Sequence, residues 1–274
     1  MRPIAALIAA GLFATTAVAE AAETVEIPRG DATLRGILFR PGGAGPFPGV
    51  VALHGCGGLL TRAGKITTRF ADWGERLAAA GLAVVFPDSF GSRGLSNQCR
   101  VRERRVRSSR ERVADANDAR RWLQGQSWTV KERVSVLGWS NGAITTLWAV
   151  RPRAAPRDGM PDFRSAVALY PGCRRLANAA WSARVPTLIL IGRADDWTPA
   201  AACEQMVAGA QGRSARASIT VYPGAYHEFD HPGLPVHVLR GLANSADGTG
   251  LAHVGTNTAA RADALKRVPE WLLR

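Results

Sequence analysis

The chain has 274 residues, of which 46% are hydrophobic and 21% are charged, and its formal net charge is +13 at pH 7. This composition excludes a disordered or fibrous chain and provides enough apolar side chains for a sizeable core. No Pro-rich or Ser-rich linker divides the sequence, so we expect a single domain over residues 20–274.

The N-terminal segment has the pattern of a secretory signal peptide. Arg2 supplies a positive charge, residues 4–13 form an apolar run, and Ala17-Val18-Ala19 has the small residues of a cleavage site. The apolar run is shorter than the roughly 20 residues that a membrane-spanning helix needs. We therefore expect residues 1–19 to be removed and the mature protein to be exported, to the periplasm or outside the cell, without membrane insertion. The alternative is a retained anchor.

Short runs rich in Val, Ile and Leu alternate with helical patterns along the rest of the chain. Such strands predict an α/β fold, with one mostly parallel central sheet covered by helices on both faces. In such a sheet the ligand crevice lies at the carboxyl ends of the strands. The last helix is expected at residues 258–273, kinked or interrupted at Pro269. The expected strands are residues 24–28, 33–39, 49–54, 82–87, 133–138, 166–170, 187–192 and 218–222.

The third expected strand ends in the glycine-rich sequence Leu53-His54-Gly55-Cys56-Gly57-Gly58. Glycines leave backbone N–H groups accessible, and two convergent N–H groups can stabilise the oxyanion of a tetrahedral intermediate. We assign the N–H of Cys56 as one donor, with Gly57 as the alternative. For His54, a structural role in shaping this loop is favoured over a catalytic role.

Arginine supplies most of the positive charge, because only Lys65, Lys131 and Lys266 are lysines. Nine arginines fall within residues 100–121, together with apolar residues at helical spacing. We expect an amphipathic helix with a solvated basic face. The alternative is a nucleic-acid or anionic-surface patch, but no recognition motif or interleaved aromatic side chain accompanies the charge. No nucleic-acid partner is therefore expected.

The sequence Gly138-Trp139-Ser140-Asn141-Gly142 lies between an expected strand and a helical pattern. Gly-x-Ser-x-Gly in this position is the nucleophile elbow, in which a sharp turn exposes the serine hydroxyl. A side chain at either glycine would collide with the neighbouring strand or helix. The N–H of Asn141, directly after the serine, is assigned as the second oxyanion donor. The alternative is a structural turn without chemistry.

The last two expected strands lead to the other groups that a serine nucleophile needs. One is followed by Asp195 and Asp196, and the other by His227. A histidine base activates the serine, and a carboxylate fixes the histidine tautomer and stabilises the imidazolium. Ser140, Asp195 and His227 occur in the chain order that accompanies the elbow motif. Asp196 is the rival acid, and a turn or a helix cap is the alternative role for Asp195.

With these residues, the chain resembles the dienelactone hydrolase family of α/β-hydrolases over nearly all of its mature length. The family acid follows a Gly-x-x-Asp turn with a proline four residues later, which matches Asp195 with Pro199 and not Asp196. The family histidine lies in Ala-x-His-x-Phe, which matches Ala225-Tyr226-His227-Glu228-Phe229. The enzymes that give the family its name have a cysteine nucleophile. Ser140 and the export signal therefore favour a more general hydrolase of small esters or lactones, with no cofactor.

Four cysteines in an exported chain favour disulfides over metal binding or catalysis. Cys56 and Cys99 are expected in loops after two successive strands, as are Cys173 and Cys203. Adjacent strand ends can bring Cα atoms within disulfide range, so we prefer the pairs Cys56–Cys99 and Cys173–Cys203. No Cys-x-x-Cys pair is present, which argues against a zinc knuckle.

The sequence His227-Glu228-Phe229-Asp230-His231 also satisfies His-Glu-x-x-His, the zinc-peptidase signature. That signature works only when a helix places both histidines on one face. Here Pro-Gly pairs precede and follow it, at most about two helical turns fit between them, and no convincing third ligand follows. We therefore expect no metal site. A catalytically inactive binding protein with the same fold is the main alternative function.

Two further features flank the expected site. Residues 151–163, which are rich in Pro, and residues 230–256, which contain several Gly, are candidates for lids over the crevice. Four aromatic residues are candidates for an acyl or alcohol pocket, with core packing as the alternative: Phe90, Trp139, Trp197 and Tyr226.

Overall fold

The computed structural model of the protein describes residues 22–30 and 32–274. The expected signal peptide, residues 1–19, lies outside the described residues. Within the described ranges, none of the helices combines the length and the apolar character that a membrane crossing requires.

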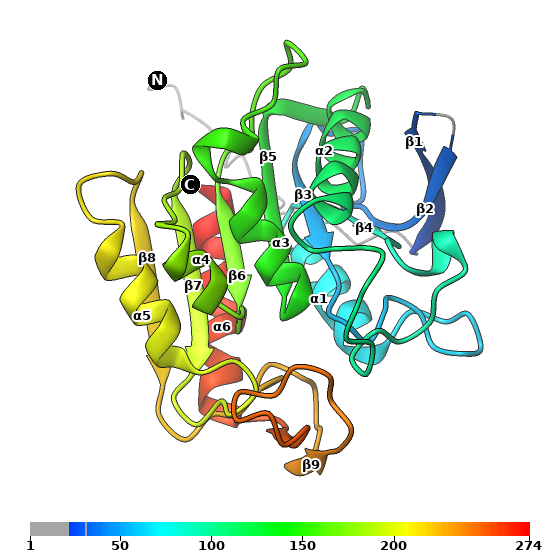
Figure 1. The fold of residues 1–274 in the computed structure, drawn as a ribbon. Coiled ribbons are helices and arrows are strands. Elements are labelled where there is room, and N and C mark those ends of the chain that lie inside the picture. Colours follow the sequence, from blue (N-terminus) through cyan, green and yellow to red (C-terminus); the bar gives the residue numbers. More distant parts are fainter. Residues whose placement is uncertain (1–21, 31) are drawn as a thin grey trace, which may run out of the picture.

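An eight-stranded sheet forms the centre of the fold (Figure 1). Its strands are β1 (Glu23–Arg29), β2 (Ala32–Phe39), β3 (Phe47–Leu53), β4 (Ala83–Pro87), β5 (Thr129–Trp139), β6 (Ala166–Leu169), β7 (Thr187–Gly192) and β8 (Ala217–Tyr222). In space their order is β1-β2-β4-β3-β5-β6-β7-β8. β2 pairs antiparallel with β1 and with β4, and every other pair is parallel. The expected mostly parallel sheet is therefore confirmed.

Helices cover both faces of this sheet, as expected (Figure 1). One face carries α1 (Thr68–Ala79) and α6 (Thr258–Leu273). The other face, toward the viewer in Figure 1, carries α2 (Glu111–Gln124), α3 (Asn141–Ala149), α4 (Arg174–Asn178) and α5 (Ala200–Gly209). Two short 3-10 helices, η1 (Gly91–Arg93) and η2 (Pro152–Ala154), lie in the connections.

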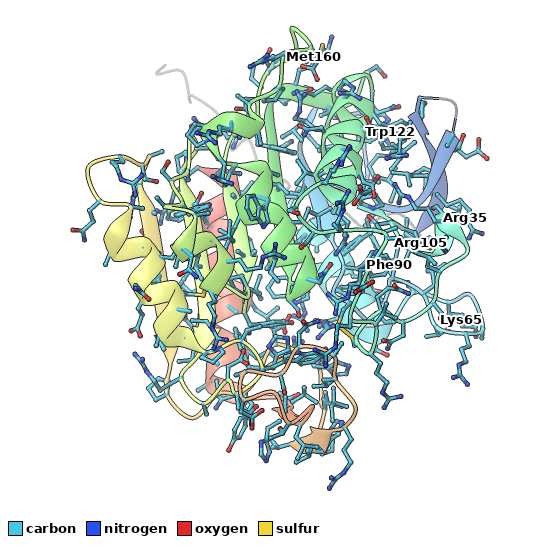
Figure 2. The ribbon with its side chains drawn as sticks, viewed as in Figure 1. Arg35, Lys65, Phe90, Arg105, Trp122 and Met160 are labelled. Atoms are coloured by element: carbon cyan, nitrogen blue, oxygen red, sulfur yellow. A yellow bond between two sulfur atoms is a disulfide. The ribbon has the colours of Figure 1, made fainter. Side chains whose placement is uncertain are left out.

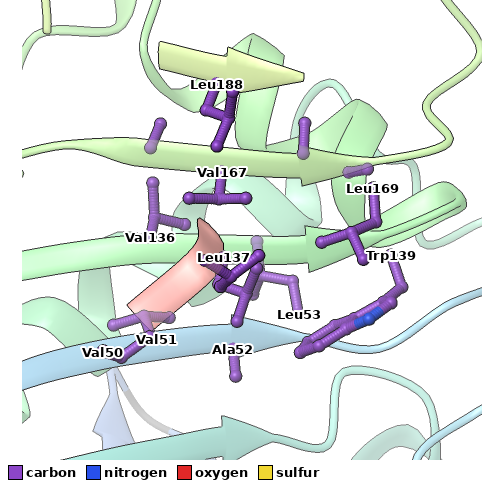
Figure 3. Close-up of a cluster of buried hydrophobic side chains, with 14 of the residues drawn as sticks. Val50, Val51, Ala52, Leu53, Val136, Leu137, Trp139, Val167, Leu169 and Leu188 are labelled. Atoms are coloured by element: carbon purple, nitrogen blue, oxygen red, sulfur yellow. The ribbon is translucent and has the colours of Figure 1, made fainter. Parts of the chain in front are cut away.

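The central strands are apolar because helices cover both of their faces. Val50, Val51, Leu137, Val167 and Ile189 are fully buried. Side chains from β3, β5, β6 and β7 gather in one cluster along the sheet (Figure 3). Burial of each such side chain contributes about 1.5–3 kcal/mol. The result is a firmly packed platform, and the loops at the carboxyl ends of its strands carry the polar residues of interest.

Helix α6 continues through Pro269, so the expected interruption there is wrong. Proline removes one N–H and crowds the preceding turn of a helix. Val268, Trp271 and Leu272 are nevertheless buried, and the helix packs on β6 and β7. This packing holds the final turn in place despite the lost hydrogen bond.

The arginine-rich segment differs from its expected form. Residues 100–110 form turns and loops, and α2 begins only at Glu111. Six of the nine arginines are exposed, as expected for solvated charges, but Arg112 and Arg120 on this helix are fully buried. Buried charges require partners. Arg120 forms an ion pair with Asp158, whereas the partners of Arg112 belong to the site described below.

Residues 230–256, which we call the cap, lie at the carboxyl ends of the strands (Figure 1). The cap contains a two-stranded antiparallel sheet of β9 (His237–Leu239) and β10 (Ala252–Val254). Leu242, Ala252 and Val254 pack with Trp197 and the Cys56–Cys99 disulfide. The cap therefore covers the loops that follow β3, β4 and β7.

The second lid candidate, residues 151–163, lies at the opposite end of the sheet. Met160 in this segment is far from the cap (Figures 1 and 2). Asp162 accepts hydrogen bonds from the guanidinium of Arg184, one of them at 2.8 Å from Nη2. The expectation that this segment covers the crevice is wrong, because it joins the end of α3 to the start of β6 at the amino ends of the strands.

Candidate active site

Ser140 lies in a strained turn between β5 and α3. Its φ and ψ angles are 51° and −113°, which residues other than glycine rarely adopt. A Cβ on Gly142 would lie 1.9 Å from the carbonyl oxygen of Leu53, and a Cβ on Gly138 would lie 2.5 Å from the carbonyl carbon of Gly142. The two glycines of the elbow motif are therefore required by close backbone contacts.

His227 lies on the loop after β8 and is fully buried. Its Nε2 is 2.9 Å from Ser140 Oγ. The rings of Tyr170 and Trp197 pack on the imidazole, with centroid distances of 4.5 and 4.7 Å. A backbone bridge to Val254 also joins this loop to the cap. Together these contacts hold the imidazole against the serine hydroxyl.

Asp195 completes the arrangement from the loop after β7. Its Oδ2 lies 2.8 Å from His227 Nδ1. Its Oδ1 accepts the backbone N–H groups of Trp197 and Thr198 at 3.0 and 2.8 Å. These backbone bonds fix the carboxylate, so the structure brings Ser140, His227 and Asp195 together in one hydrogen-bonded series.

Thr198 is a site residue that the sequence analysis missed. Its hydroxyl lies 2.9 Å from Asp195 Oδ2 and 3.1 Å from His227 Nδ1. It also lies 3.2 Å from the carbonyl oxygen of Tyr170. The Asp-x-x-Thr spacing is also that of an ordinary capping turn, so the sequence alone does not distinguish this role.

The loop after β3 passes beside the serine. A Cβ on Gly55 would lie 3.7 Å from Ser140 Cβ. Within the part of the chain that the structure describes, the N–H groups of Cys56 and Asn141 donate to no protein acceptor. Asn141 is the first residue of α3, where helix N–H groups lack intrahelical partners. The lack of a protein acceptor at both N–H groups is compatible with the assignment of oxyanion donors.

The structure contains both preferred disulfides. Cys56–Cys99 joins the loops after β3 and β4, with a Cα–Cα distance of 4.9 Å. Cys173–Cys203 has a Cα–Cα distance of 5.0 Å. Cys203 lies within α5 and not in a loop, which differs from the expected placement. The first disulfide anchors the residue whose N–H is assigned to the oxyanion site.

His54 is fully buried and does not contact the serine hydroxyl. Its Nδ1 lies 2.8 Å from the carbonyl oxygen of Gly55, and its ring packs against Phe90 at 4.8 Å. Burial, with a further contribution from Arg112, lowers the pKa of His54 well below its usual value. The imidazole is therefore neutral, in agreement with the structural role favoured from the sequence.

The four aromatic pocket candidates have different environments. Phe90 and Trp139 are 1% and 0% exposed, so core packing is correct for both and a pocket-lining role is wrong. Trp197 covers His227. Tyr226 is half-buried and stacks on His253 of the cap at 5.0 Å. The last two residues therefore border the site, whereas the first two support it from below.

The zinc-peptidase signature does not form a helix. Residues 227–231 form a turn, and Glu228 has a φ of 61°, which an α-helix does not allow. Among residues 22–30 and 32–274, no three His, Cys, Asp or Glu side chains are grouped to hold a metal ion. The one-face arrangement of two histidines that the signature requires is absent from this segment.

A buried acid, Asp230, was also missed from the sequence. Its carboxylate accepts hydrogen bonds from Trp73 Nε1, Trp139 Nε1 and the Tyr170 hydroxyl, at 2.7, 2.8 and 2.6 Å. Burial raises the pKa of Tyr170 well above its usual value, so this hydroxyl remains a donor. No local motif marks Asp230, because its partners come from α1, β5 and the loop after β6.

Glu228 and Arg69 form an ion pair beside this network, with Oε1 and Nη1 2.9 Å apart. Burial disfavours the charged forms of both side chains, but their mutual attraction outweighs this effect. Glu228 raises the pKa of Arg69 above its usual value, and Arg69 lowers the pKa of Glu228. The second residue of the would-be zinc signature is therefore engaged in a structural contact.

Comparisons with known proteins agree with this architecture. The profile of the dienelactone hydrolase family matches residues 34–274. A candidate dienelactone hydrolase from Klebsiella pneumoniae is 21% identical, with a TM-score of 0.69 over 93% of this chain and 98% of that one. No curated protein matches.

Two further solved structures share the fold. Dienelactone hydrolase from Anabaena variabilis is 20% identical, with a TM-score of 0.62 over 92% of this chain and 97% of that one. Esterase 2 from Thermogutta terrifontis is 17% identical, with a TM-score of 0.64 over 92% and 94% of the two chains. Likenesses at these identities establish the α/β-hydrolase architecture.

Proposed function

The chain belongs to the dienelactone hydrolase family, and we propose that it is a serine hydrolase that cleaves carboxylic esters or lactones through an acyl-enzyme intermediate. The observation that carries this proposal is the series Asp195 Oδ2 to His227 Nδ1 at 2.8 Å and His227 Nε2 to Ser140 Oγ at 2.9 Å. Serine is a poor nucleophile until a positioned base takes its proton.

The hydrogen-bond geometry supports the following course of the protons in the first step. A carboxylate only accepts, so His227 Nδ1 carries a proton and Nε2 is free to accept one from the Ser140 hydroxyl. As Oγ bonds to the ester carbon, that proton moves to Nε2, and the imidazolium is stabilised by Asp195. Nε2 then gives the proton to the departing alkoxide, and an acyl group remains on Oγ.

Water completes the cycle by the same route. His227 Nε2 takes a proton from water, the hydroxide attacks the acyl carbon, and the Ser140 oxygen leaves with the proton returned to it. In both steps negative charge develops on the former carbonyl oxygen. The N–H groups of Cys56 and Asn141, which donate to no protein acceptor among the described residues, would receive that charge.

The substrate class follows from the nucleophile and the surroundings of the site. A serine in place of the cysteine of the enzymes that name the family favours general esters and lactones over dienelactone. Two disulfides within the described residues support the expected export of the protein. A non-catalytic binding protein is the alternative, but a binding role alone does not require the strained Ser140 backbone or its contact with His227.

A fluorophosphonate probe tests the proposal directly. We expect covalent labelling of Ser140 in the wild-type protein and none in Ser140→Ala. The matched control is Ser135→Ala in β5, because Ser135 is also buried but its hydroxyl bonds that of Ser165 in the core. Equal labelling of wild type and Ser140→Ala would remove this serine from the mechanism. Hydrolysis of p-nitrophenyl esters of increasing acyl length, with lactones alongside, then defines the substrate class.

A further inference from the structure

One buried side chain, Arg112, connects the two segments that carry the assigned oxyanion donors. Arg112 is the second residue of α2 and is fully buried. Its Nη1 donates to Asn141 Oδ1 at 2.6 Å, and its Nη2 donates to the carbonyl oxygen of His54 at 2.8 Å. A single planar group thus bridges the end of β3 and the start of α3.

The hydrogen bond from Arg112 to His54 also supports the N–H of Cys56, indirectly, through the imidazole of His54. His54 Nδ1 lies 2.8 Å from the carbonyl oxygen of Gly55, which can only accept, so Nδ1 is the donor. That carbonyl and the N–H of Cys56 belong to the same planar peptide group. A hydrogen bond to the carbonyl fixes the plane and strengthens the N–H as a donor. Arg112 therefore supports Asn141 directly and Cys56 through His54.

The charge of Arg112 has no contacting counter-ion. Within residues 22–30 and 32–274 it makes no ion pair, and both of its hydrogen bonds go to neutral oxygens. Burial lowers the pKa of Arg112 to about 9, with Asp115 and Asp88 opposing this effect, so the group is cationic at neutral pH. A buried cation without a counter-ion in contact is costly to the fold. Negative charge on a substrate oxygen would offset that cost.

We propose that Arg112 is a positioning residue that preorganises the oxyanion site and supplies it with positive charge. The inference rests on the proposed function, because it presumes that Ser140 attacks a carbonyl group. The competing role is purely structural: Arg112 lies over the ring of Phe90, 5.1 Å from its centroid, and fills space beneath α2. The two roles differ in what they predict for turnover.

The test compares Arg112→Met with wild type on p-nitrophenyl acetate and on a trifluoromethyl ketone, which forms a tetrahedral oxyanion adduct with serine. Loss of one oxyanion donor costs about 10²–10³-fold in kcat. We expect Arg112→Met to lower kcat by about 10²-fold with KM within about threefold, and to weaken ketone binding in parallel. Arg112→Lys keeps the charge but cannot bridge both acceptors, so it should lose about tenfold.

Arg120 provides a matched control on the same helix. It is also fully buried and bonds Gln124, Asp158 and the carbonyl oxygen of Pro161, about two turns farther along α2. We expect Arg120→Met to lose thermal stability while kcat per folded molecule stays unchanged. If Arg112→Met behaves in the same way as Arg120→Met, the structural role is correct and the proposal is overturned.

A second variant covers the case in which Arg112→Met does not fold. Asn141→Ala keeps the backbone N–H and removes the side-chain carboxamide, including the oxygen that Arg112 binds. We expect it to lower kcat and ketone affinity by about tenfold with KM unchanged. Wild-type values in both Asn141→Ala and Arg112→Lys would overturn the inference. Ser140→Ala distinguishes failure of the proposed function from failure of the role of Arg112. If Ser140→Ala stays active, the proposed function is wrong. If it is inactive while the Asn141 and Arg112 variants keep full turnover, only the role of Arg112 is wrong.

Discussion

Asp196 holds His253 of the cap through two hydrogen bonds, from the backbone N–H at 2.8 Å and from the ring Nδ1 at 2.7 Å. The adjacent Asp195 instead contacts His227. The Asp196–His253 side chains are 44% and 42% exposed, whereas the Asp195–His227 pair is fully buried. One turn therefore supplies two acids, one that contacts His227 and one that contacts the cap.

We therefore expect substitution of the two aspartates to lower kcat by different amounts. Asp195→Asn should lower kcat by about 10⁴-fold, because an amide nitrogen opposite Nδ1 cannot accept its proton and the wrong imidazole tautomer becomes favoured. Asp196→Asn should stay within roughly tenfold of wild type, because its amide oxygen still accepts the N–H of His253. The measurement is kcat at saturating ester on folded variants. A severe defect in Asp196→Asn beside a mild one in Asp195→Asn would reverse the assignment.

The two disulfides should have similar effects on stability and different effects on turnover. They span 43 and 30 residues, so each contributes about 4 kcal/mol in the chain-entropy account. Only the Cys56–Cys99 disulfide fixes an assigned oxyanion donor. We expect the Cys56→Ser/Cys99→Ser protein to lose at least tenfold in kcat under conditions where it remains folded. The control, Cys173→Ser/Cys203→Ser, should keep its turnover.

Kinetics and urea unfolding on the two double variants check this prediction. Equal kcat in both, with equal loss of stability, would mean that the loop after β3 holds its shape without the disulfide. In that case the hydrogen bond from Gln98 N–H to the carbonyl oxygen of Cys56, at 2.8 Å, would be sufficient to hold it.

The strands and the hydrogen-bonded series of Ser140, His227 and Asp195 could be predicted because their signals are local. A buried parallel strand is a continuous apolar run, and the elbow is read from Gly138 and Gly142, which close backbone contacts require. The choice of Asp195 over Asp196 came from the spacing to Pro199 in the family resemblance. These features depend on neighbours a few residues apart, so they are present in the sequence itself.

Arg112 and Asp230 were missed for the opposite reason. The partners of Arg112 are 29 and 58 residues away in the chain, and the indole partners of Asp230 are 157 and 91 residues away. A charged residue in an arginine-rich segment is usually solvated, so its burial is decided by tertiary packing. The same effect placed Phe90 and Trp139 in the core and not in a pocket.

The Arg69–Glu228 ion pair predicts how stability responds to acid. Arg69 lowers the folded-state pKa of Glu228, so the pair contributes stability above the unfolded pKa of about 4.3 and loses it as pH falls through the folded value. We expect Glu228→Gln to be less stable than wild type at pH 7, by about 1–3 kcal/mol. The difference should shrink below pH 4.

Urea unfolding at pH 7 and at successive values below pH 5 measures this difference. A constant gap between wild type and Glu228→Gln at every pH would contradict the prediction. The same variant bears on the zinc alternative, in which Glu228 would be the general base. We expect Glu228→Gln to keep most of the esterase rate and 1,10-phenanthroline to leave the wild-type rate unchanged.

Asp230 should be the acid on which the stability of the loop carrying His227 depends most. Replacement by Leu leaves the donors of Trp73, Trp139 and Tyr170 buried without an acceptor, at about 1–3 kcal/mol each. Because a domain of this kind is stable by only about 5–15 kcal/mol, Asp230→Leu should unfold or nearly unfold the protein. Asp230→Asn keeps one oxygen for the two indoles, and the Tyr170 hydroxyl can accept from the new amide, so it should cost only about 1–3 kcal/mol.

Asp263 is the control for this comparison, because it also accepts a tyrosine hydroxyl, that of Tyr222 at 2.7 Å, but its side chain is 36% exposed. Water can replace a lost partner there, so Asp263→Leu should cost less than about 1 kcal/mol. Urea unfolding gives all three values. If Asp230→Leu were as stable as Asp263→Leu, the indole and phenol donors would have to find other acceptors. The other contacts of the loop that carries His227, with Tyr170, Trp197 and the cap, would then be sufficient to hold it, and turnover in Asp230→Leu should match wild type.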